Sequence, residues 1–417
     1  MELRERLQYI FKETNPWWKE ADFAVKSYRE RKVYAKIEKF LKLPQIIALV
    51  GLRRTGKTTL MLKIAESYLR RIPASNVLYF SFDDFSGLDL EDLMAAYKEI
   101  FPQIDLRSGE YLFCFDEAQK LDGWQDKLKR LYDTYKNIKI IISGSESLFI
   151  RKGIKETLGG RIFEFRVSQL NFSEYLQFIG KQKFIENPLL YKEDLLRQYR
   201  FFLKTNGFPE LAAVRDNSVI HKYLKESVMD KILFKDIPQL FKVRDPGVLG
   251  EILDIIIYSP GQIIDMTKLA KELSLSRQVV SSYLDYLEKA FLIKKLYNFS
   301  KNLRKQKRAL KKFYPAIVFP EIVEEKFPLC FENHLIWELG AHFFWRDAYK
   351  NEVDAVLADK NKKITAVEIK TGEIDLKSVN SFMEKYKLSK GLVITIDKEG
   401  MRGNVRLAPF YKQILGS

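Results

Sequence analysis

Residues 51–58 have the sequence Gly-Leu-Arg-Arg-Thr-Gly-Lys-Thr, whose spacing of glycines, lysine and threonine is typical of a loop that wraps around phosphate groups. An apolar run at residues 46–50 leads into this loop, and a helix-forming run at residues 59–69 leads out of it. In such a unit the glycines let backbone N–H groups approach an anion, which also meets the positive end of the helix. The pattern therefore predicts an α/β fold with a parallel sheet and a phosphate site where the first strand ends.

The same loop predicts how ATP would be held. We expect Lys57 to reach the β- and γ-phosphates and the hydroxyl of Thr58 to bind Mg²⁺. A chance match to the spacing is the alternative, but the strand before the loop and the helix after it favour phosphate binding. The residues predicted to contact the nucleotide are Gly51, Arg53, Arg54, Thr55, Gly56, Lys57, Thr58 and Thr59.

A second apolar run, at residues 111–115, ends in the two carboxylates Asp116 and Glu117. The carboxyl ends of parallel strands meet at one edge of a sheet, so these side chains are expected beside the phosphate loop. We expect Asp116 to hold Mg²⁺ and Glu117 to orient and deprotonate the attacking water. Most acidic pairs are solvated loop ends, and it is the phosphate loop upstream that favours hydrolysis here.

Further candidates lie on neighbouring segments. The next apolar run ends at Ser143, which we prefer to Ser145 as a hydroxyl lying between the acidic strand and the phosphate loop; a simple Ser-Gly turn is the alternative. Arg161 follows a glycine pair and could act as an arginine finger. Arg53 and Arg54 are rival cations for stabilising transition-state charge, and the sequence does not choose among the three arginines.

The composition favours a polyanionic partner. The chain carries 71 Lys and Arg residues against 55 Asp and Glu residues, a formal net charge of +16, and clustered positive charge binds nucleic acid with release of counterions. A merely soluble basic protein is the alternative. Cys114 and Cys330 lie in apolar stretches and imply neither a disulfide framework nor a zinc site. The N-terminal residues lack the apolar core of a signal peptide, and no apolar run reaches membrane-spanning length, so we expect a cytoplasmic protein without membrane contact.

The sequence predicts three helices joined by short turns, at residues 248–260, 265–273 and 276–290. Ser276 is a favourable N-cap for the third of these helices. This is the order of a helix-turn-helix, in which the last helix enters the major groove of DNA. The side chains expected to pack inward are Val279, Val280, Leu284 and Leu287. The side chains expected to face DNA are Arg277, Gln278, Ser281 and Ser282.

A basic segment follows the third helix. Residues 294–312 contain nine basic side chains and no acidic one: Lys294, Lys295, Lys301, Arg304, Lys305, Lys307, Arg308, Lys311 and Lys312. Such a segment after a recognition helix looks like the wing of a winged helix, and a solvated face or a protein-docking module are the alternatives. The wing residues predicted to contact DNA are Lys301, Arg304, Lys305, Lys307 and Arg308.

Four side chains near the C-terminus suggest a second chemistry. Glu368 and Lys370 are two positions apart on a predicted strand and so share one face, and hairpin pairing can bring Asp354 beside Glu368. Glu332 opens a helix-like run upstream. Three carboxylates and a lysine would bind one or two divalent ions, Mg²⁺ or Mn²⁺, and activate water against a phosphodiester. A hairpin with solvated charges and a fold kept only for docking are the alternatives.

Several of these motifs together resemble one family, the archaeal ATPases, an AAA-like branch of the P-loop proteins. The matching segments are residues 15–18 (Asn-Pro-Trp-Trp), 51–59, 115–119 (Phe-Asp-Glu-Ala-Gln) and 143–145 (Ser-Gly-Ser). Residues 206–210 resemble the family's Gly-Gly-Phe-Pro element with Asn206 in place of the first glycine, a change that left-handed backbone angles tolerate. The Asp354, Glu368 and Lys370 pattern, with Glu332, resembles the restriction-endonuclease-like nucleases.

The resemblance spans nearly the whole chain and implies an α/β multidomain protein. The predicted parts are an N-terminal helical extension at residues 1–43, a P-loop ATPase core at 44–168, a helical lid at 169–245, a winged helix at 246–320 and a restriction-endonuclease-like domain at 321–417. The sequence thus predicts a Mg²⁺-dependent ATPase that binds nucleic acid, DNA above all, with ATP switching the DNA-binding parts. Cleavage by the last domain and assembly into homo-oligomers stay open.

Two other interpretations compete with this one. The first is an ATP-dependent regulatory or signalling switch whose C-terminal domain docks protein or DNA without cleavage. The second is a transcription regulator without enzymatic activity. Glu117 argues against the second, because a module that only senses ATP has no need of a water-activating carboxylate.

Overall fold

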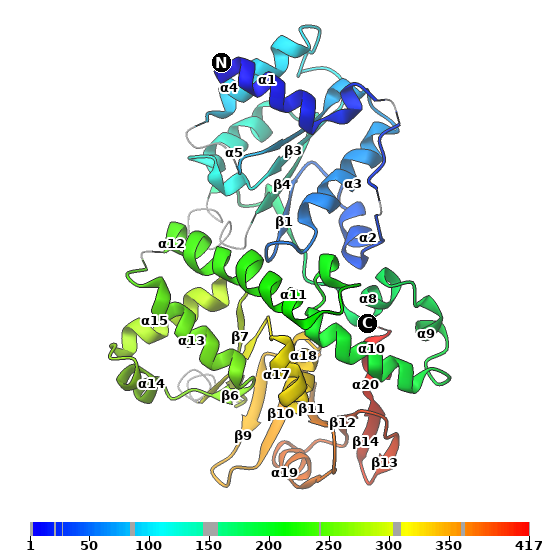
Figure 1. Ribbon diagram of the computed structural model, residues 1–417, viewed down its shortest axis with the longest axis vertical. Helices are drawn as coiled ribbons and strands as arrows, with labels where there is room; N and C mark the ends of the chain where they lie inside the picture. The colour runs from blue at the N-terminus through cyan, green and yellow to red at the C-terminus, as the bar shows by residue number, and fades with distance from the viewer. Residues whose placement is uncertain are drawn as a thin grey trace. The chain divides into compact units, whose positions relative to one another are not determined.

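The computed structural model describes residues 3–20, 22–26, 28–83, 88–144, 157–241, 243–302, 310–359 and 363–416. The chain divides into two compact units, a first unit of residues 1–168 and a second unit of residues 169–417 (Figure 1). Five residues singled out above lie outside the described ranges, namely Ser145, Arg304, Lys305, Lys307 and Arg308.

The first unit is built on a parallel sheet. In the described part of this unit five strands pair in the order β2-β3-β4-β1-β5, and every neighbouring pair is parallel. The strands are β1 (Ile46–Val50), β2 (Val77–Ser81), β3 (Tyr111–Asp116), β4 (Ile138–Gly144) and β5 (Ile162–Arg166). The predicted parallel α/β sheet is confirmed. The strand that ends near Ser143 lies between the acidic strand β3 and the strand β1 that leads into the phosphate loop.

Helices cover both faces of this sheet, which is why its strands are apolar along their whole length. Alternate residues of β1 serve the two faces: Ile46 and Ala48 pack with α1, α4 and α5, whereas Ile47 and Leu49 pack with α2 and α3 (Figure 1). The helices are α1 (Leu3–Thr14), α2 (Lys32–Glu38), α3 (Lys57–Leu69), α4 (Leu90–Ile100) and α5 (Trp124–Thr134).

The N-terminal segment belongs to this unit and is not a separate extension. Asn15 pairs with both backbone groups of Tyr79 on the edge strand β2: its Oδ1 accepts from the N–H at 2.7 Å and its Nδ2 donates to the carbonyl at 2.9 Å. The ring nitrogens of Trp17 and Trp18 both donate to the carbonyl of Val77 at 3.0 Å. These side chains satisfy backbone groups that an open sheet edge would leave unpaired.

The second unit contains one long mixed sheet. Within its described residues nine strands pair in the order β13-β14-β12-β11-β10-β9-β7-β8-β6. The strands are β6 (Gln262–Ile263), β7 (Ile293–Asn298), β8 (Lys311–Pro315), β9 (Phe343–Arg346), β10 (Glu352–Ala358), β11 (Ile364–Lys370), β12 (Gly391–Thr395), β13 (Gly400–Arg402) and β14 (Val405–Pro409). Because β7 and β9 pair in parallel, the sheet runs without a break across the predicted boundary near residue 320.

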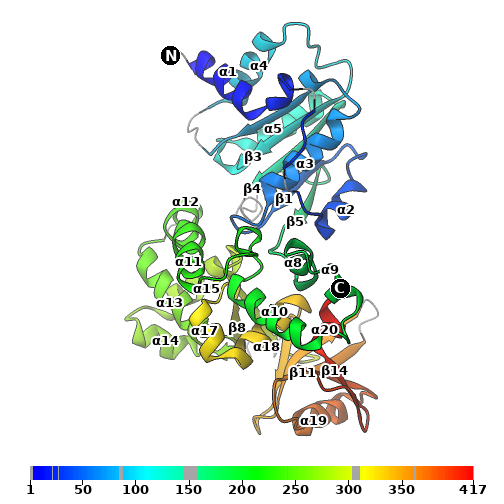
Figure 2. The same ribbon diagram turned by 45° about the vertical axis from the view of Figure 1, so that its right-hand side comes forward.

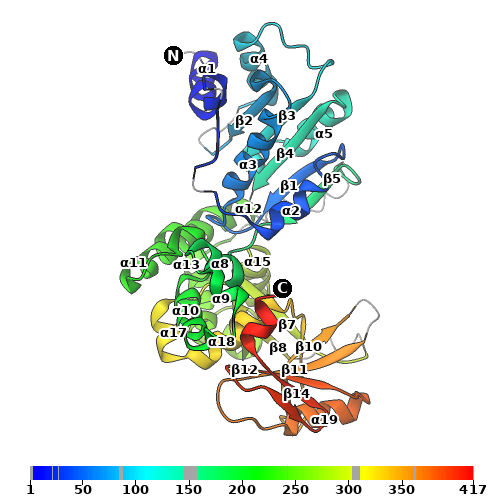
Figure 3. The ribbon, with the colours of Figure 1, turned by 90° about the vertical axis from the view of Figure 1, so that its right-hand side faces the viewer.

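Helices flank this sheet. Figure 3 shows α19 on one side of β10, β11 and β12, with α18 and α20 on the other side. Figure 2 shows α10 beside α17 and α18. The helices are α8 (Phe172–Phe178), α9 (Gln182–Glu186), α10 (Lys192–Thr205), α11 (Asn217–Lys222), α12 (Ile237–Leu240), α13 (Pro246–Tyr258), α14 (Met266–Glu272), α15 (Arg277–Lys289), α17 (Pro320–Glu325), α18 (Phe327–Glu338), α19 (Lys377–Tyr386) and α20 (Phe410–Ile414). Across all the residues that the structure describes, none of the helices combines the length and the apolar character that crossing a bilayer requires.

Candidate functional site

The phosphate loop joins β1 to α3, and its two glycines are required by the backbone. A β-carbon on Gly51 would lie 2.2 Å from the carbonyl oxygen of Val167, which no side chain tolerates. Gly56 has a φ angle of +93°, in the region that glycine adopts readily. The spacing read from the sequence therefore corresponds to a real constraint on the loop.

Lys57 is buried at the first position of α3, with 6% of its surface exposed. Its ammonium donates to the carbonyls of Gly51 at 3.1 Å and Leu52 at 2.9 Å. The hydroxyl of Thr55 also donates to the carbonyl of Leu52, at 2.9 Å. These bonds hold the cation against the loop from which the backbone N–H groups would bind phosphate.

Asp116 is the centre of the site. It is 5% exposed, and its Oδ2 accepts hydrogen bonds from the hydroxyls of Thr58 at 2.6 Å and Tyr79 at 3.0 Å. Its Oδ1 accepts from the hydroxyl of Ser143 and from the backbone N–H of Glu117, the latter at 3.2 Å. Side chains from three strands and the start of α3 thus converge on one carboxylate.

Tyr79 was not foreseen as part of the site, because its sequence position in β2 reads only as a buried aromatic residue. Burial, and next the negative charge of Asp116, raise the pKa of Tyr79 well above its ordinary value. The phenol therefore stays protonated and donates to the carboxylate. A protonated donor at this place keeps Asp116 in one orientation.

Glu117 lies beyond the strand end with a positive φ angle of 52°, which turns its side chain out of the strand direction. Its backbone N–H also donates to the hydroxyl of Ser143 at 3.3 Å. The side-chain amide of Gln119 donates to Oε2 of Glu117. Gln119 thus orients the predicted base.

Arg31 is a second residue that sequence reasoning missed. It precedes α2, far from the loop in sequence, yet it is 6% exposed and donates to the carbonyl of Thr55 at 3.0 Å and to that of Ser168 at 2.7 Å. One guanidinium therefore joins the phosphate loop to the last residue of the first unit.

Arg161 occupies a place that contradicts its predicted role within this chain. Ile46 and Ile162 pair at the start of β1 and β5, so Arg161 lies at the edge of the sheet opposite the phosphate loop. Its guanidinium is also paired with Asp133, with Nε to Oδ1 at 3.0 Å. Parallel strands send their two ends to opposite edges, and Arg161 precedes its strand whereas the loop follows β1.

The oxygen atoms at this site suit a magnesium ion. Thr58 supplies a hydroxyl and Asp116 a carboxylate, both ligands of hard cations, and Mg²⁺ typically takes its other ligands from water and nucleotide phosphates. Thr59 is exposed at the start of α3, Arg53 is partly buried, and Arg54 is exposed with a φ angle of 61°.

A second candidate surface lies on α15. Ser276 caps this helix as predicted, by accepting from the N–H of Val279 at 3.2 Å. Arg277, Gln278 and Ser281 are exposed and Ser282 is partly exposed. On the other face of the helix Val280, Leu284 and Leu287 are buried, while Val279 is only partly buried.

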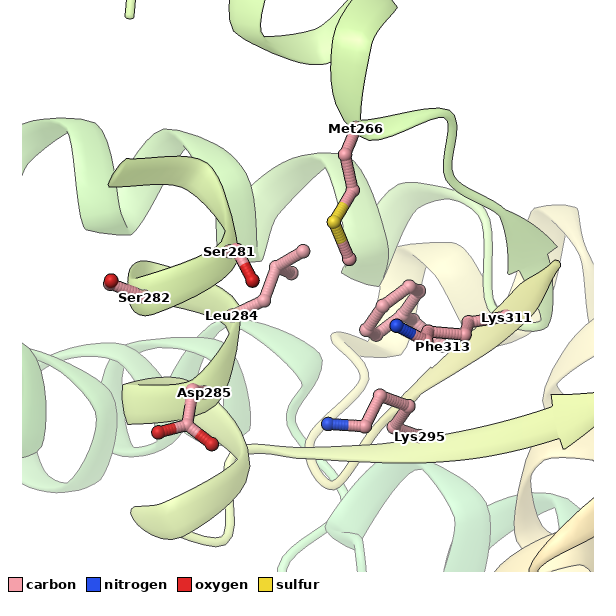
Figure 4. A pocket seen from close by; sticks show the side chains of 8 residues that line it. All are labelled: Met266, Ser281, Ser282, Leu284, Asp285, Lys295, Lys311 and Phe313. Carbon is pink, nitrogen blue, oxygen red and sulfur yellow. The ribbon is translucent and has the colours of Figure 1, made fainter. Parts of the chain in front are cut away.

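A hollow of about 230 Å³ separates α15 from the strands β7 and β8 (Figure 4). Ser281 and Ser282 line it from the helix, and Lys295 and Lys311 line it from the strands. Burial, and then the charges of Lys295 and Arg277, hold the pKa of Lys311 below its ordinary value. Two lysines and the carboxylate of Asp285 therefore line the hollow beside the helix face that was predicted to meet DNA.

The basic segment is not uniformly a wing. Lys301 is exposed in the described part of the segment. Lys294 donates to the carbonyl of Ile336 at 3.1 Å, and Lys295 forms an ion pair with Glu288. Lys312 is 5% exposed and turns away from solvent altogether.

The predicted C-terminal carboxylates come together at the middle of the long sheet. Ala355 pairs with Val367, so the next step along the two antiparallel strands brings Asp354 opposite Glu368. Lys370 pairs with Glu368, with Nζ to Oε1 at 2.7 Å. Oδ2 of Asp354 accepts from the backbone N–H of Ile369 at 2.8 Å.

The arrangement nevertheless corrects the expected metal site. In the described ranges, no three His, Cys, Asp or Glu side chains are grouped so that they could hold a metal ion. Instead the ammonium of Lys312 lies 2.5 Å from Glu352, 3.5 Å from Glu332 and 3.9 Å from Asp354. Lys312 comes from β8, so a residue predicted near the wing supplies the positive charge at this cluster.

The ionisation of the cluster follows from its burial. Burial, and then the charges of Glu332 and Glu368, raise the pKa of Asp354 well above its ordinary value, and burial also raises the pKa of Glu368. Burial alone would lower the pKa of Lys312, but the carboxylates around it raise that pKa above its ordinary value. Lys312 is therefore a cation held by carboxylates.

Comparison with known families supports the prediction of a P-loop ATPase core in the first unit. Residues 43–176 match the family model described as an AAA domain. The first unit therefore contains an AAA-type P-loop ATPase domain, as predicted. Residues 196–316 and residues 333–411 each match a model described as a domain of unknown function.

Relatives with similar sequences occur in archaea and bacteria. An uncharacterised protein of Methanocaldococcus jannaschii is 29% identical over 61% of this chain, and the match spans 57% of that protein's length. A second uncharacterised protein of the same organism is 25% identical over 90% of this chain and 86% of its own length. An uncharacterised protein of Haemophilus influenzae is 26% identical over 64% of this chain and 65% of its own.

Solved structures give only distant likenesses. Cdc6p from Pyrobaculum aerophilum has a TM-score of 0.32 at 14% identity, covering 76% of this chain and 96% of its own. The Aeropyrum pernix ORC1 protein, solved in complex with DNA, has a TM-score of 0.33 at 13% identity, with the same coverage. Scores this low do not define a shared arrangement of the whole chain.

Proposed function

We propose that this protein is a Mg²⁺-dependent ATPase whose ATP cycle controls nucleic-acid binding by its second unit. The observation that carries the proposal is the hydrogen bond of 2.6 Å between Thr58 and Asp116. It joins the start of the phosphate-loop helix to the acidic strand end, the two elements that ATP hydrolysis in P-loop proteins requires.

The roles of the side chains follow from their contacts. Thr58 and Asp116 would hold Mg²⁺, which when bound shields the negative charge of the phosphates. Glu117 accepts the proton of the attacking water. Gln119 and Ser143 hold Glu117 in place through their hydrogen bonds to it. Lys57 stabilises the charge that develops on the transferred phosphoryl group.

Coupling between the site and the rest of the chain has a physical basis in the first unit. The last residues of this unit lie against the phosphate loop, since Val167 approaches Gly51 and Arg31 binds the carbonyls of both Thr55 and Ser168. A loop that shifts when phosphate binds or leaves would therefore move the point where the chain continues into the second unit.

Nucleic-acid binding is supported by the helix α15 and its surroundings. The winged-helix proposal is supported by the order of α13, α14 and α15 and by the antiparallel pairing of β6, β8 and β7 at one end of the long sheet. Exposed Arg277 and Lys301 offer contacts to phosphates, and Lys311, which lies near the cations Lys295 and Arg277, would gain from a phosphate nearby.

The test is DNA binding by Glu117→Gln with and without ATP. This variant should bind ATP without hydrolysing it, since it loses the base and keeps the ligands of Mg²⁺, and we expect a reduction of the hydrolysis rate by roughly 10²–10⁴-fold. Its affinity for duplex DNA, measured by fluorescence anisotropy, should differ between ATP and no nucleotide, while Lys57→Ala should show no difference. Hydrolysis at the normal rate by Glu117→Gln, or DNA affinity that ignores ATP, contradicts the proposal.

A metal-dependent nuclease at the carboxylate cluster is the second candidate. One observation favours it: Oε2 of Glu368, a residue 4% exposed, has no hydrogen-bond partner in the described structure. The position of Lys312 opposes it, and with a lysine among the carboxylates the residues do not fit a divalent ion. The same lysine favours the alternative of an ATP-dependent switch whose C-terminal domain docks protein or DNA without cleaving it.

A further inference from the structure

Lys312 lies among carboxylates, two of which, Glu332 and Asp354, were predicted to bind a divalent cation. Its ammonium approaches three of them, Glu352 at 2.5 Å, Glu332 at 3.5 Å and Asp354 at 3.9 Å. A metal ion bound by carboxylates also lies between their oxygen atoms, at about 2.0–2.6 Å from each. The ammonium and a metal ion would therefore compete for the same oxygens.

The strand β8 explains how this lysine reaches the cluster. Alternate residues of a strand point to opposite faces. Lys311 and Phe313 line the hollow beside α15, whereas Lys312 and Tyr314 face the carboxylates, and the hydroxyl of Tyr314 donates to Oε1 of Glu332 at 2.7 Å. Pairing of β7 with β9 brings β8 into the same sheet as β10 and β11.

With all four of its carboxyl groups ionised, the cluster would be nearly balanced in charge without a metal ion. Four carboxylates, Glu332, Glu352, Asp354 and Glu368, face three cations, and the cations are Lys312, Lys370 and Arg346. Arg346 binds Oε2 of Glu352 at 3.1 Å. Adding a divalent ion would make the buried cluster positive, whereas removing Lys312 would leave a deficit of positive charge that such an ion could fill.

We propose that Lys312 is a built-in substitute for the divalent cation, so that the cluster excludes metal as long as this side chain is in place. The partner of the carboxylates is then the chain's own β8, which also carries Lys311 into the hollow beside α15. The strand β8 thus joins the hollow beside α15, through Lys311, to the carboxylate cluster, through Lys312. The inference does not depend on nucleic-acid binding or on ATP hydrolysis by the first unit.

The experiment is a titration of the full-length protein with Mn²⁺, in which the free ion is followed by electron paramagnetic resonance. Lys312→Met should bind one more Mn²⁺ per chain than the wild type, and the double variant Lys312→Met/Glu368→Gln should lose that additional ion. The loss assigns the ion to the cluster, because any ion at the ATP site is common to all the proteins compared. Lys311→Met is the matched control, since it removes the same charge from the opposite face of β8, and it should bind as the wild type does.

Two results would overturn the inference. One is a wild-type protein that already binds an ion sensitive to Glu368→Gln, and the other is a Lys312→Met protein that binds no additional ion. If Lys312→Met fails to fold, Lys312→Met/Glu352→Gln removes both members of the closest pair and is read in the same way. ATP hydrolysis measured on the same samples tests the proposed function separately, since its residues lie in the first unit.

Discussion

The hydroxyl of Thr58 on α3 and Oδ2 of Asp116 at the end of β3, residues 58 positions apart, form a hydrogen bond of 2.6 Å. In the sheet, β4 lies between β3 and the strand β1 that leads to α3. The intervening strand β4 contributes Ser143, whose hydroxyl binds the other oxygen of the same carboxylate. Asp116 is thus fixed from both sides. The sequence predicted all three residues for the site, and the sheet order explains why they meet.

Ser143 is a positioning residue, and Ser143→Ala should lower kcat for ATP more than it changes KM. The hydroxyl holds Asp116 and accepts from the backbone N–H of Glu117, so its loss lets the base drift, and a misplacement of about 1 Å can cost up to roughly 10²-fold in rate. Steady-state kinetics checks this expectation, and Ser143→Thr, which keeps the hydroxyl, should restore most of the rate. Equal loss in both substitutions would contradict this role, because the hydroxyl that Thr retains would then not restore the rate.

Arg161→Ala should leave ATP hydrolysis nearly unchanged in dilute protein. Arg161 lies at the opposite edge of the sheet and binds Asp133 in an exposed ion pair, and such pairs add little to stability. The kcat of the variant, measured over a range of protein concentrations, provides the check. A loss of rate that appears only at high concentration would indicate that Arg161 acts on the site of another copy.

Arg31 should matter where Arg161 does not. Arg31→Met removes the donor from two carbonyls, and hydrogen bonds to a charged group are typically worth about 1.5–3 kcal/mol. We expect weaker ATP binding and, more tellingly, a smaller effect of ATP on DNA affinity. Arg31→Lys keeps the charge but not the two-pronged geometry, so it should recover little of the coupling. If ATP changes the DNA affinity of Arg31→Met as much as that of the wild type, the coupling between the two sites does not pass through the contact of Arg31 with Ser168.

The sequence was most informative where one short segment sets its own structure. The phosphate loop is such a case, because its glycines and the apolar strand before it are adjacent in the chain. Lys312 shows the opposite case: its neighbours made it part of a basic wing, but pairing of β7 with β9 buries it among carboxylates. Arg31 was missed for the same reason, since its partners are Thr55 and Ser168. Contacts that depend on which distant strands pair leave no local pattern.

Nucleic-acid binding should depend on salt through particular cations. Arg277→Ala and Lys301→Ala, both at exposed positions, should each weaken DNA binding and reduce the slope of log K against log salt by about one unit. Lys289→Ala is the matched control, because Lys289 lies at the far end of the same helix and pairs with Asp285 at 2.8 Å. Anisotropy titrations at several salt concentrations measure the slopes. A slope that changes equally in all three variants would point to general charge rather than to a bound face.

The second unit should lose stability in acid through His334. The ring of His334 packs against Phe202, its Nδ1 forms a hydrogen bond of 2.6 Å with the hydroxyl of Tyr199, and burial lowers its pKa from 6.5 to about 3. The unfolded chain takes up the proton near pH 6.5 and the folded chain resists it, so acid favours unfolding. The ionisation of His334 therefore costs no stability above pH 6.5. Below it, the free energy of unfolding falls by up to about 1.4 kcal/mol per pH unit until the pH approaches 3.

The check is the thermal unfolding midpoint of wild type and His334→Gln between pH 4.5 and 7.5. The wild type should be the more stable at pH 7.5, and the difference should shrink steadily below pH 6.5. The raised pKa values of Asp354 and Glu368 act in the opposite direction, since acid protonates these carboxyls first in the folded state, but both proteins share them. Their effect therefore cancels in the difference. A gap between the two midpoints that stays constant across this range would show that His334 is not held neutral by the fold.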